Sequence, residues 1–360
     1  MTHAPYAGEH LGPRPHVAVI FRDQIGDFVV ATPLMRGMRE RFPDIVLDYF
    51  GGERTRELEE ASRLVAARFS LFGGSTDSLS TFIERRTREA GPYSLAVNLE
   101  SDPTAARVSG MLFPRFVVGA FVDPITGEDR TPPTNGIDRL WSDVWNRADL
   151  LADYPELRTQ FIGEIFCRLA RVETDFTRAE VPLATAPFQT PSVLIATGAS
   201  RGAKLWPEEH WTALTSWLIN RGHQVGLLGA AAPVQIATYH AGAVDDILVA
   251  QGVADLRGSL TLPQVAGALA SARVFVTVDN GLMHLAAAVG APTFALFGAS
   301  PQRIWAPRSP SVQILEPSNP CSLCEENRFR NADCLLPIHQ CMQSVELARL
   351  IRDLSPLLEG

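Results

Sequence analysis

The stretch TGASRGAKLW contains Lys204, the only lysine of the 360-residue chain. The other 31 of its 32 lysine and arginine side chains are arginines, so a lysine kept here suggests a task that arginine does less well. An ammonium is a compact charge that can neutralise a phosphate, whereas a guanidinium favours a planar partner with two acceptors. Thr197, Gly198 and Ser200 form a small-residue turn before it, which suits phosphate oxygens. A solvated surface lysine is the alternative interpretation.

A second stretch, VTVDNGLMHLAAAVG, combines an acid, a glycine and a histidine at the start of an expected helix. Asp279 ends a buried β-branched strand, and His284 follows in the first turn of an alanine-rich helix. The amides of Asn280, Gly281 and Leu282 would face an anion at this helix start. The alternative for His284 is a core imidazole that is bonded to the backbone.

A third stretch, IGD, lies near the N-terminus, where a strand gives way to a helix. Gly26 allows the chain to pass close to a ligand, and Asp27 lies where the helix begins. Aspartate often caps a helix, so capping is the alternative to a functional role for Asp27.

Alternating strands and helices must position these side chains. In the first half, HVAVIF predicts a strand from about His16, FVVATPLMRGMRERFP a helix, IVLDYFGG a strand, TRELEEASRLVAARF a helix and YSLAVNLE a strand. A second alternation begins at SVLIATGAS. The pattern predicts an α/β fold with doubly wound parallel sheets, in which ligands bind at the carboxyl ends of the strands. All three stretches lie at such strand ends.

The length of the chain favours two domains. We expect an N-terminal Rossmann-like domain over residues 15–180, a C-terminal one over 190–345, and a final helix over 346–360. The proline-rich stretch ETDFTRAEVPLATAPFQTP is the expected linker. Residues 121–136 are polar and rich in proline and glycine, which predicts a mobile surface loop.

Composition excludes several classes of protein. A net charge of −8 argues against a nucleic-acid binder, which needs a basic face for phosphate. No apolar run reaches the ~20 residues of a membrane span, and the N-terminus lacks the apolar core of a secretion signal. We therefore expect a cytosolic protein and leave open a peripheral attachment to the membrane.

Four of the five cysteines fall within 21 positions, in the stretch CSLCEENRFRNADCLLPIHQC. These are Cys321, Cys324, Cys334 and Cys341. Four thiolates suit a structural zinc or iron site in a cytosolic protein, with free thiols and disulfides as alternatives. Cys167 stands alone in a helical pattern and is expected to be a packed core thiol.

Four segments, in order, resemble those of the family-nine glycosyltransferases, whose best-known members are the ADP-heptose:lipopolysaccharide heptosyltransferases. They are IGDFVVATPLMRGMRERFP, GASRGAKLWPEEHWTAL, VDNGLMHLAAAVGAPTFALFGASPQRIWAP and the cysteine-rich stretch. The resemblance covers nearly the whole chain. It implies a GT-B fold, in which two Rossmann-like domains face each other across a cleft, with the donor bound by the C-terminal domain and the acceptor by the N-terminal one.

The resemblance also implies an inverting transfer that needs no metal or other cofactor for catalysis. Asp27 corresponds to the general base that deprotonates the acceptor hydroxyl. Lys204 corresponds to the lysine that binds the diphosphate and, with the amides at Asn280 and Gly281, would stabilise the departing nucleotide. The residues expected to bind the donor are Gly26, Thr197, Gly198, Ser200, Asp279, Asn280, Gly281 and His284.

The expected partners are a nucleotide-sugar donor such as ADP-heptose and a carbohydrate acceptor such as lipopolysaccharide core, which would place the enzyme at the inner face of the cytoplasmic membrane. A natural-product or protein acceptor, a nucleotide-sugar epimerase of the same fold, and a binding subunit without catalysis are the alternatives. The stretch after QVGLLG lacks the acid that many relatives use for the ribose, a place that Gln235 could take. Asn280 replaces the serine or threonine usual in the family.

Overall fold

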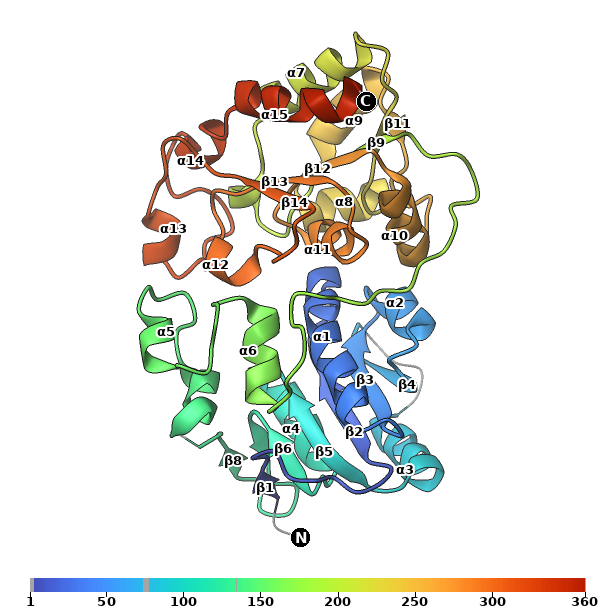
Figure 1. The fold of residues 1–360 in the computed structure, drawn as a ribbon, viewed down its shortest axis with the longest axis vertical. Helices are drawn as coiled ribbons and strands as arrows, with labels where there is room; N and C mark the ends of the chain where they lie inside the picture. Colours follow the sequence, from blue (N-terminus) through green and yellow to red (C-terminus); the bar gives the residue numbers. More distant parts are fainter. Residues whose placement is uncertain (1–2, 74–77, 134, 360) are drawn as a thin grey trace. The chain divides into compact units, whose positions relative to one another are not determined.

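The computed structural model of the chain describes residues 3–73, 78–133 and 135–359. The chain folds into two compact units, Met1–Pro182 and Leu183–Gly360, each built on its own parallel sheet (Figure 1). The boundary falls within the proline-rich stretch after residue 172, where the chain makes no helix or strand until β9.

The N-terminal unit has a six-stranded sheet in the order β1-β6-β5-β2-β3-β4, and all its pairs are parallel. Because β3 and β4 extend from one side of β2 while β5 and β6 extend from the other, the strand order reverses beside β2. The strands are β1 (Ala4–Pro5), β2 (His16–Ile20), β3 (Val46–Gly52), β4 (Ala67–Phe72), β5 (Tyr93–Asn98) and β6 (Phe116–Val118). Its helices are α1 (Ile25–Arg41), α2 (Arg56–Ala61), α3 (Leu79–Ala90), α4 (Pro103–Met111), the 3₁₀ helix η1 (Gly136–Ser142), α5 (Leu150–Asp153) and α6 (Ile162–Leu169).

Helix α1 contains a proline that would ordinarily break it. Pro33 lies eight positions after Ile25, well beyond the first turn in which a proline is tolerated. It lacks the N–H that would bond the Val29 carbonyl, and the hydroxyl of Thr32 donates to that oxygen instead, at 2.7 Å. The helix therefore continues through Pro33 with its carbonyl satisfied.

The helix expected over TRELEEASRLVAARF is wrong in its second half. Helix α2 ends at Ala61, and the chain enters the edge strand β4, whose Ala67 pairs with Asp48 of β3. Phe69 of this strand is buried, with its ring centroid 5.2 Å from that of Phe82. Pairing with β3 and burial of this ring outweigh a helical pattern that is local to the sequence.

The loop expected over residues 121–136 contains an antiparallel hairpin, β7 (Phe121–Val122) with β8 (Asp129–Arg130). This hairpin packs closely on α4, because a Cβ atom at Gly110 would collide with the carbonyl oxygen of Val122. The part of this stretch around residue 134 lies outside the described residues.

The C-terminal unit has a parallel sheet in the order β11-β10-β9-β12-β13-β14. Numbered along the chain, this is the order 3-2-1-4-5-6 of a dinucleotide-binding sheet, which reverses between β9 and β12. The strands are β9 (Val193–Ala196), β10 (Val225–Leu227), β11 (Ala254–Asp255), β12 (Val274–Val278), β13 (Thr293–Leu296) and β14 (Val312–Leu315).

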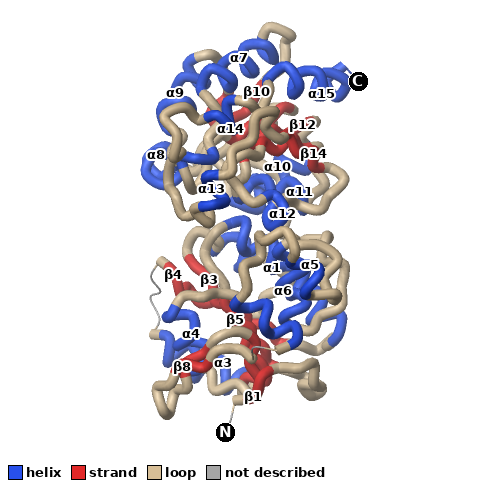
Figure 2. The backbone as a smooth tube through the Cα atoms, turned by 90° about the vertical axis from the view of Figure 1, so that its left-hand side faces the viewer, coloured by secondary structure: helices blue, strands red, loops and turns tan. Residues whose placement is uncertain are grey.

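Helices lie on both sides of this second sheet, as Figure 2 shows in blue. One core joins the strands to α7, α9 and α15, and a smaller one joins them to α11. The helices are η2 (Gly202–Lys204), α7 (Glu208–Ile219), α8 (Ala232–Tyr239), α9 (Gly242–Ala250), α10 (Leu262–Ser271), α11 (Gly281–Ala288), α12 (Gln302–Trp305), α13 (Leu323–Glu326), α14 (Gln340–Gln343) and α15 (Leu347–Glu359). No helix within the described ranges is long and apolar enough to cross a lipid bilayer.

Candidate functional site

The C-terminal unit gathers most of the predicted side chains at the point where its strand order reverses. Strands β9 and β12 are direct neighbours, with Ala196 paired to Thr277, so the residues that follow both strands leave the sheet at the same edge. Thr197 follows β9, and Asp279 follows β12. Ligands bind at this position in open α/β sheets.

Lys204 and Asp279 form an ion pair at this edge, with 2.6 Å between Nζ and Oδ2. The side chains are only 16% and 6% exposed, so the alternative of a solvated surface lysine does not hold. Burial alone would raise the pKa of the Asp279 carboxyl, but the Lys204 ammonium and the Ser300 hydroxyl outweigh it and lower that pKa. The Asp279 carboxyl therefore favours its ionised form, and it holds the Lys204 side chain at this strand end.

His284 lies beside this pair as a neutral imidazole. It is 4% exposed, and its ring stands edge-on to Trp305 with 6.3 Å between centroids. Burial lowers the pKa of His284 to about 4, although the nearby Asp279 carboxylate acts in the opposite direction. At neutral pH the His284 imidazole can donate one hydrogen bond and accept another here without adding a second positive charge.

Asn280 caps helix α11 and so corrects one expectation. Its Oδ1 accepts from the amides of Leu282 and Met283 at 3.0 and 3.1 Å. We expected the Leu282 amide to face an anion, but it is already bonded to this cap. Its Nδ2 donates to the Gly198 carbonyl at 2.8 Å, which ties the two strand-end turns together. The Gly281 amide is not used by this cap.

The turn after β9 separates its two hydroxyl groups. Thr197 is buried and its hydroxyl donates to the buried carboxylate of Asp245, whereas Ser200 is exposed. Gly198 is closely packed, because a Cβ atom there would come 2.7 Å from Nε2 of Gln235. Gln235 is itself buried, and its Oε1 accepts from the Ala230 amide at 3.1 Å. Gln235 thus fills the space between the strand-end turns of β9 and β10.

The N-terminal unit places Gly26 and Asp27 in the first turn of α1, next to the reversal point of its own sheet. The N-cap position of α1 is Gln24, and Asp27 is 8% exposed inside the helix. Across this strand edge, Arg22 after β2 donates to Glu100 after β5, with 2.5 Å between Nε and Oε2. The helix begins at Ile25 and so includes the IGD stretch, three residues before the start at Phe28 that we expected.

The four clustered cysteines line one small cavity together with His339, while all five cysteines of the chain are free thiols. Among residues 3–73, 78–133 and 135–359, no group of three or more histidine, cysteine, aspartate or glutamate side chains is arranged to hold a metal ion. Burial and the neighbouring thiols raise the pKa of Cys341 to about 11. The thiols are thus gathered, as expected, but they do not have the geometry of a metal site. Below, residues 321–342 are called the cysteine segment.

Cys167 lies apart from that cluster, in helix α6. It is 2% exposed, and burial raises the pKa of its thiol to about 12. This is a packed core thiol, as the helical pattern predicts.

Three functional candidates were not identified from the sequence. Ser300 lies beside Asp279, and the guanidinium of Arg201 donates to the carbonyl oxygens of Asn331 and Ala299. His339 bonds the carbonyl of the residue before Lys204. Arg201 and Ser300 had a signal in the sequence, because they closely follow β9 and β13 at strand ends of the same sheet, whereas His339 had none.

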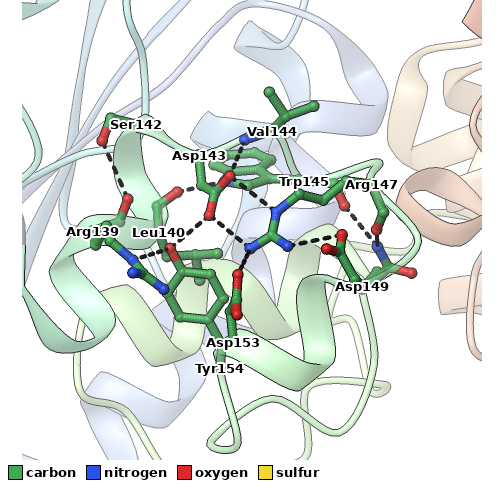
Figure 3. Close-up of polar contacts among 11 residues, drawn as sticks. Arg139, Leu140, Ser142, Asp143, Val144, Trp145, Arg147, Asp149, Asp153 and Tyr154 are labelled. Carbon is green, nitrogen blue, oxygen red and sulfur yellow. Dashed lines mark hydrogen bonds and ion pairs between the residues drawn. The ribbon is translucent and has the colours of Figure 1, made fainter.

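A separate polar cluster in the N-terminal unit surrounds Arg147 (Figure 3). Its guanidinium bonds Asp143 through two nitrogens at 3.0 and 3.1 Å, Asp149 at 2.8 Å and Asp153 at 2.5 Å. Tyr154 donates to Asp143 at 2.8 Å. These groups satisfy one another, so the cluster holds together a segment with little regular structure and does not form part of the candidate site.

Known proteins resemble this chain over nearly its whole length. The family model described as glycosyltransferase family 9 (heptosyltransferase) matches residues 144–333. Lipopolysaccharide heptosyltransferase 2 of Salmonella typhimurium is 30% identical over 358 residues, which cover 95% of this chain and 98% of that protein.

Solved structures give the same result for the fold. The ADP-heptose lipopolysaccharide heptosyltransferase II of Escherichia coli superposes with a TM-score of 0.66 at 19% identity, covering 96% of this chain and 98% of that one. The iron-containing dodecameric glycosyltransferase TibC of enterotoxigenic E. coli superposes with a TM-score of 0.55 at 15% identity, covering 96% and 77%. With two parallel six-stranded sheets, these likenesses confirm the predicted fold class, GT-B with two Rossmann-like domains.

Proposed function

Because the chain belongs to glycosyltransferase family 9, the heptosyltransferase family, and is therefore a glycosyltransferase, we propose that it moves a heptose from ADP-heptose to a hydroxyl of a lipopolysaccharide-core acceptor. The names of its relatives support both the donor and the acceptor. In this proposal the C-terminal unit binds the donor and the N-terminal unit binds the acceptor. The reaction takes place at the inner face of the cytoplasmic membrane, where such an acceptor is made.

The observation that carries the proposal is the Lys204–Asp279 ion pair at the reversal point of the C-terminal sheet. The oxygens of a diphosphate bound there would accept hydrogen bonds from the Lys204 ammonium and from the Gly281 amide at the start of α11. Asp279 keeps the ammonium oriented before the donor arrives, and neutral His284 can donate a hydrogen bond to the same group. Lys204 would then stabilise the negative charge that develops on ADP as it leaves.

The transfer itself needs a base on the acceptor side, and we assign that role to Asp27. As the acceptor oxygen forms its bond to C1 of the heptose, the bond between C1 and the phosphate oxygen breaks and its electron pair leaves with ADP. The acceptor proton passes to the Asp27 carboxylate. Attack from the face opposite ADP inverts the anomeric centre, and no step requires a metal.

The matched variants Asp27→Asn and Lys204→Ala test this assignment. Asp27→Asn keeps the size of the side chain but cannot accept the proton, so we expect ADP affinity to stay within about twofold while the transfer rate falls by about 100- to 10,000-fold. Lys204→Ala should instead weaken ADP binding. The measurements are calorimetric titration with ADP and a heptose-transfer assay. Near-normal transfer by Asp27→Asn would rule out Asp27 as the base.

For the cysteine segment we propose a structural zinc or iron bound by Cys321, Cys324, Cys334 and Cys341. The proposal is supported by the number of thiols around one cavity and by the iron that the TibC structure contains, while the present thiol geometry does not favour it. No step of the transfer depends on this metal. Elemental analysis of purified protein should find about one metal ion per chain, and less than about one tenth of that in a Cys321→Ser, Cys324→Ser double variant. Equal metal contents in the two proteins would contradict the proposal.

A further inference from the structure

Lys204 ends the 3₁₀ turn η2, which is only three residues long. Two backbone hydrogen bonds close it, from Lys204 N to Arg201 O at 3.0 Å and from Leu205 N to Gly202 O at 3.1 Å. Neither flanking residue, Arg201 nor Leu205, caps the turn with its side chain. So short a turn does not hold its own conformation in water, and the direction in which the Lys204 side chain leaves it must be fixed from outside.

The cysteine segment supplies that support at the residue before the lysine. The amide of Ala203 donates to the Ala332 carbonyl at 3.0 Å, and the carbonyl of Ala203 lies 2.6 Å from Nε2 of His339. Because a carbonyl oxygen only accepts, Nε2 of His339 carries the hydrogen. Ala203 is fully buried, so water cannot replace either bond.

The same segment also reaches the neighbourhood of Asp279, the partner of Lys204. Arg201 donates to the carbonyl of Asn331 at 3.2 Å and to that of Ala299. Ala299 precedes Ser300, the hydroxyl that helps to lower the pKa of Asp279. The turn that carries Lys204 is therefore tied to residues 331–339, and through Arg201 it also bonds the loop that carries Ser300.

His339 also belongs to the cysteine cavity. His339 lines it together with the four thiols, and Nδ2 of Asn331 donates to Sγ of Cys324 at 3.3 Å. Hydrogen bonds thus link Cys324 to the Lys204 turn through Asn331 and Arg201, and His339, which lines the same cavity, bonds the peptide group before Lys204.

We propose that His339 is a positioning residue of the donor site, which holds the Ala203 carbonyl so that Lys204 faces the diphosphate. The cysteine segment is thereby part of the donor-binding apparatus. This inference rests on the proposed function, because it takes Lys204 as the ligand of the diphosphate.

His339→Leu tests the inference, because leucine has a similar bulk but no N–H to donate. We expect this variant to bind ADP about tenfold more weakly, to show a raised donor KM, and to keep its kcat at saturating donor. His339→Gln, which regains an amide donor, should recover most of the affinity. Ile338→Ala is the matched control, since Ile338 is the preceding residue and is exposed, and it should leave ADP affinity unchanged. An unchanged affinity in His339→Leu would overturn the proposal.

A double variant separates this inference from the proposed function. If His339 acts through Lys204, then Lys204→Ala with His339→Leu binds ADP no more weakly than Lys204→Ala alone. Losses that add would show that His339 acts by another route and overturn the inference alone. If Lys204→Ala binds ADP as well as the wild type does, the proposed function itself fails and the inference falls with it.

A second measurement uses the wild-type protein and does not depend on how a variant folds. By linkage, a donor site that includes the cysteine segment must tighten that segment when ADP binds. Amide hydrogen exchange across residues 331–339 should therefore slow several-fold at saturating ADP. Identical rates with and without ADP would contradict the inference.

Discussion

Lys204 is the residue whose chemical type points most clearly to a phosphate ligand. The chain uses arginine at every other basic position, yet the side chain paired with Asp279 is a lysine. The 2.6 Å contact and the low exposure leave room for a compact ammonium, whereas a guanidinium is larger and spreads its charge over a plane. Position 204 therefore calls for a compact cation and not merely for a positive charge.

The substitution Lys204→Arg tests that point. It retains the positive charge, so an account based on charge alone predicts normal binding. We expect ADP affinity to fall at least about tenfold, because the guanidinium cannot occupy the ammonium position beside Asp279 and still reach a phosphate. Calorimetric titration with ADP measures this directly. An affinity equal to that of the wild type would show that any cation suffices.

The buried His284 should make the folded protein less stable at acidic pH. The pKa of His284 is about 4 in the folded protein and about 6.5 when unfolded, so between these values only the unfolded state binds the proton. Folding stability should therefore be fully present above pH 6.5 and fall by up to about 3 kcal/mol as the pH drops to 4.

Urea unfolding at several pH values measures this loss, with His284→Gln as the comparison. Burial also lowers the pKa of His210 and His339, so the wild type will retain a slope from these groups. The difference between wild type and His284→Gln isolates His284. Parallel stability curves for the two proteins would mean that His284 does not stay neutral in the folded state.

Residue types and strand-end positions were enough to find Lys204, Asp279 and His284 in the sequence. Hydrogen bonds made by side chains were not readable in this way. Asn280 takes the Leu282 amide for its cap, and Thr197 turns its hydroxyl to Asp245. His339 lies 136 positions from the carbonyl that it bonds, and no local pattern indicates such a contact.

At the scale of elements, local periodicity predicted a helix or strand correctly where one pattern corresponds to one element. It was wrong where one pattern spans two elements. The strands β2, β3, β5, β9 and β12 are buried runs that stand out in the sequence. The segment that contains α2 and β4 reads as one helix, because the pairing that makes β4 a strand comes from β3. The hairpin of β7 and β8 was missed for a similar reason, since its close packing on α4 is a tertiary contact.

The Arg147 cluster is expected to stabilise residues 139–161, a segment with little regular structure. Gln160 donates to the carbonyls of Trp145 and Arg147 at 2.8 and 2.7 Å, so these bonds join the chain before and after α5. Lysine at position 147 could not reproduce the forked bonds to Asp143 and Asp153. We expect Arg147→Lys to speed amide hydrogen exchange across residues 139–161.

Arg130→Lys is the control, because the Arg130 guanidinium forms an exposed ion pair with Glu128, outside the Arg147 cluster. Exchange in residues 139–161 should not change in this variant. The same exchange rates in Arg147→Lys and the wild type would show that the segment is held by its apolar contacts, such as the edge-on rings of Trp145 and Phe166.

At the scale of the whole molecule, the alternation of strands and helices predicts two parallel sheets, and general rules of connection limit their strand orders. The order 3-2-1-4-5-6 of the C-terminal sheet explains why residues about 80 positions apart, after β9 and after β12, come to one edge. The N-terminal sheet also reverses beside its first long strand, where α1 carries Asp27. Each unit thus presents its candidate residues at the corresponding place of its own sheet.

Thermal unfolding of the wild type and of Lys204→Ala, with and without ADP-heptose, shows whether the donor diphosphate binds at Lys204. At a donor concentration of 100 times Kd, binding should stabilise the wild type by about 2.7 kcal/mol, which is about 5–10 °C for a unit of this size. The same concentration should shift Lys204→Ala by much less, while Asp27→Asn shifts like the wild type. Equal shifts in the wild type and Lys204→Ala would contradict a diphosphate site built on Lys204.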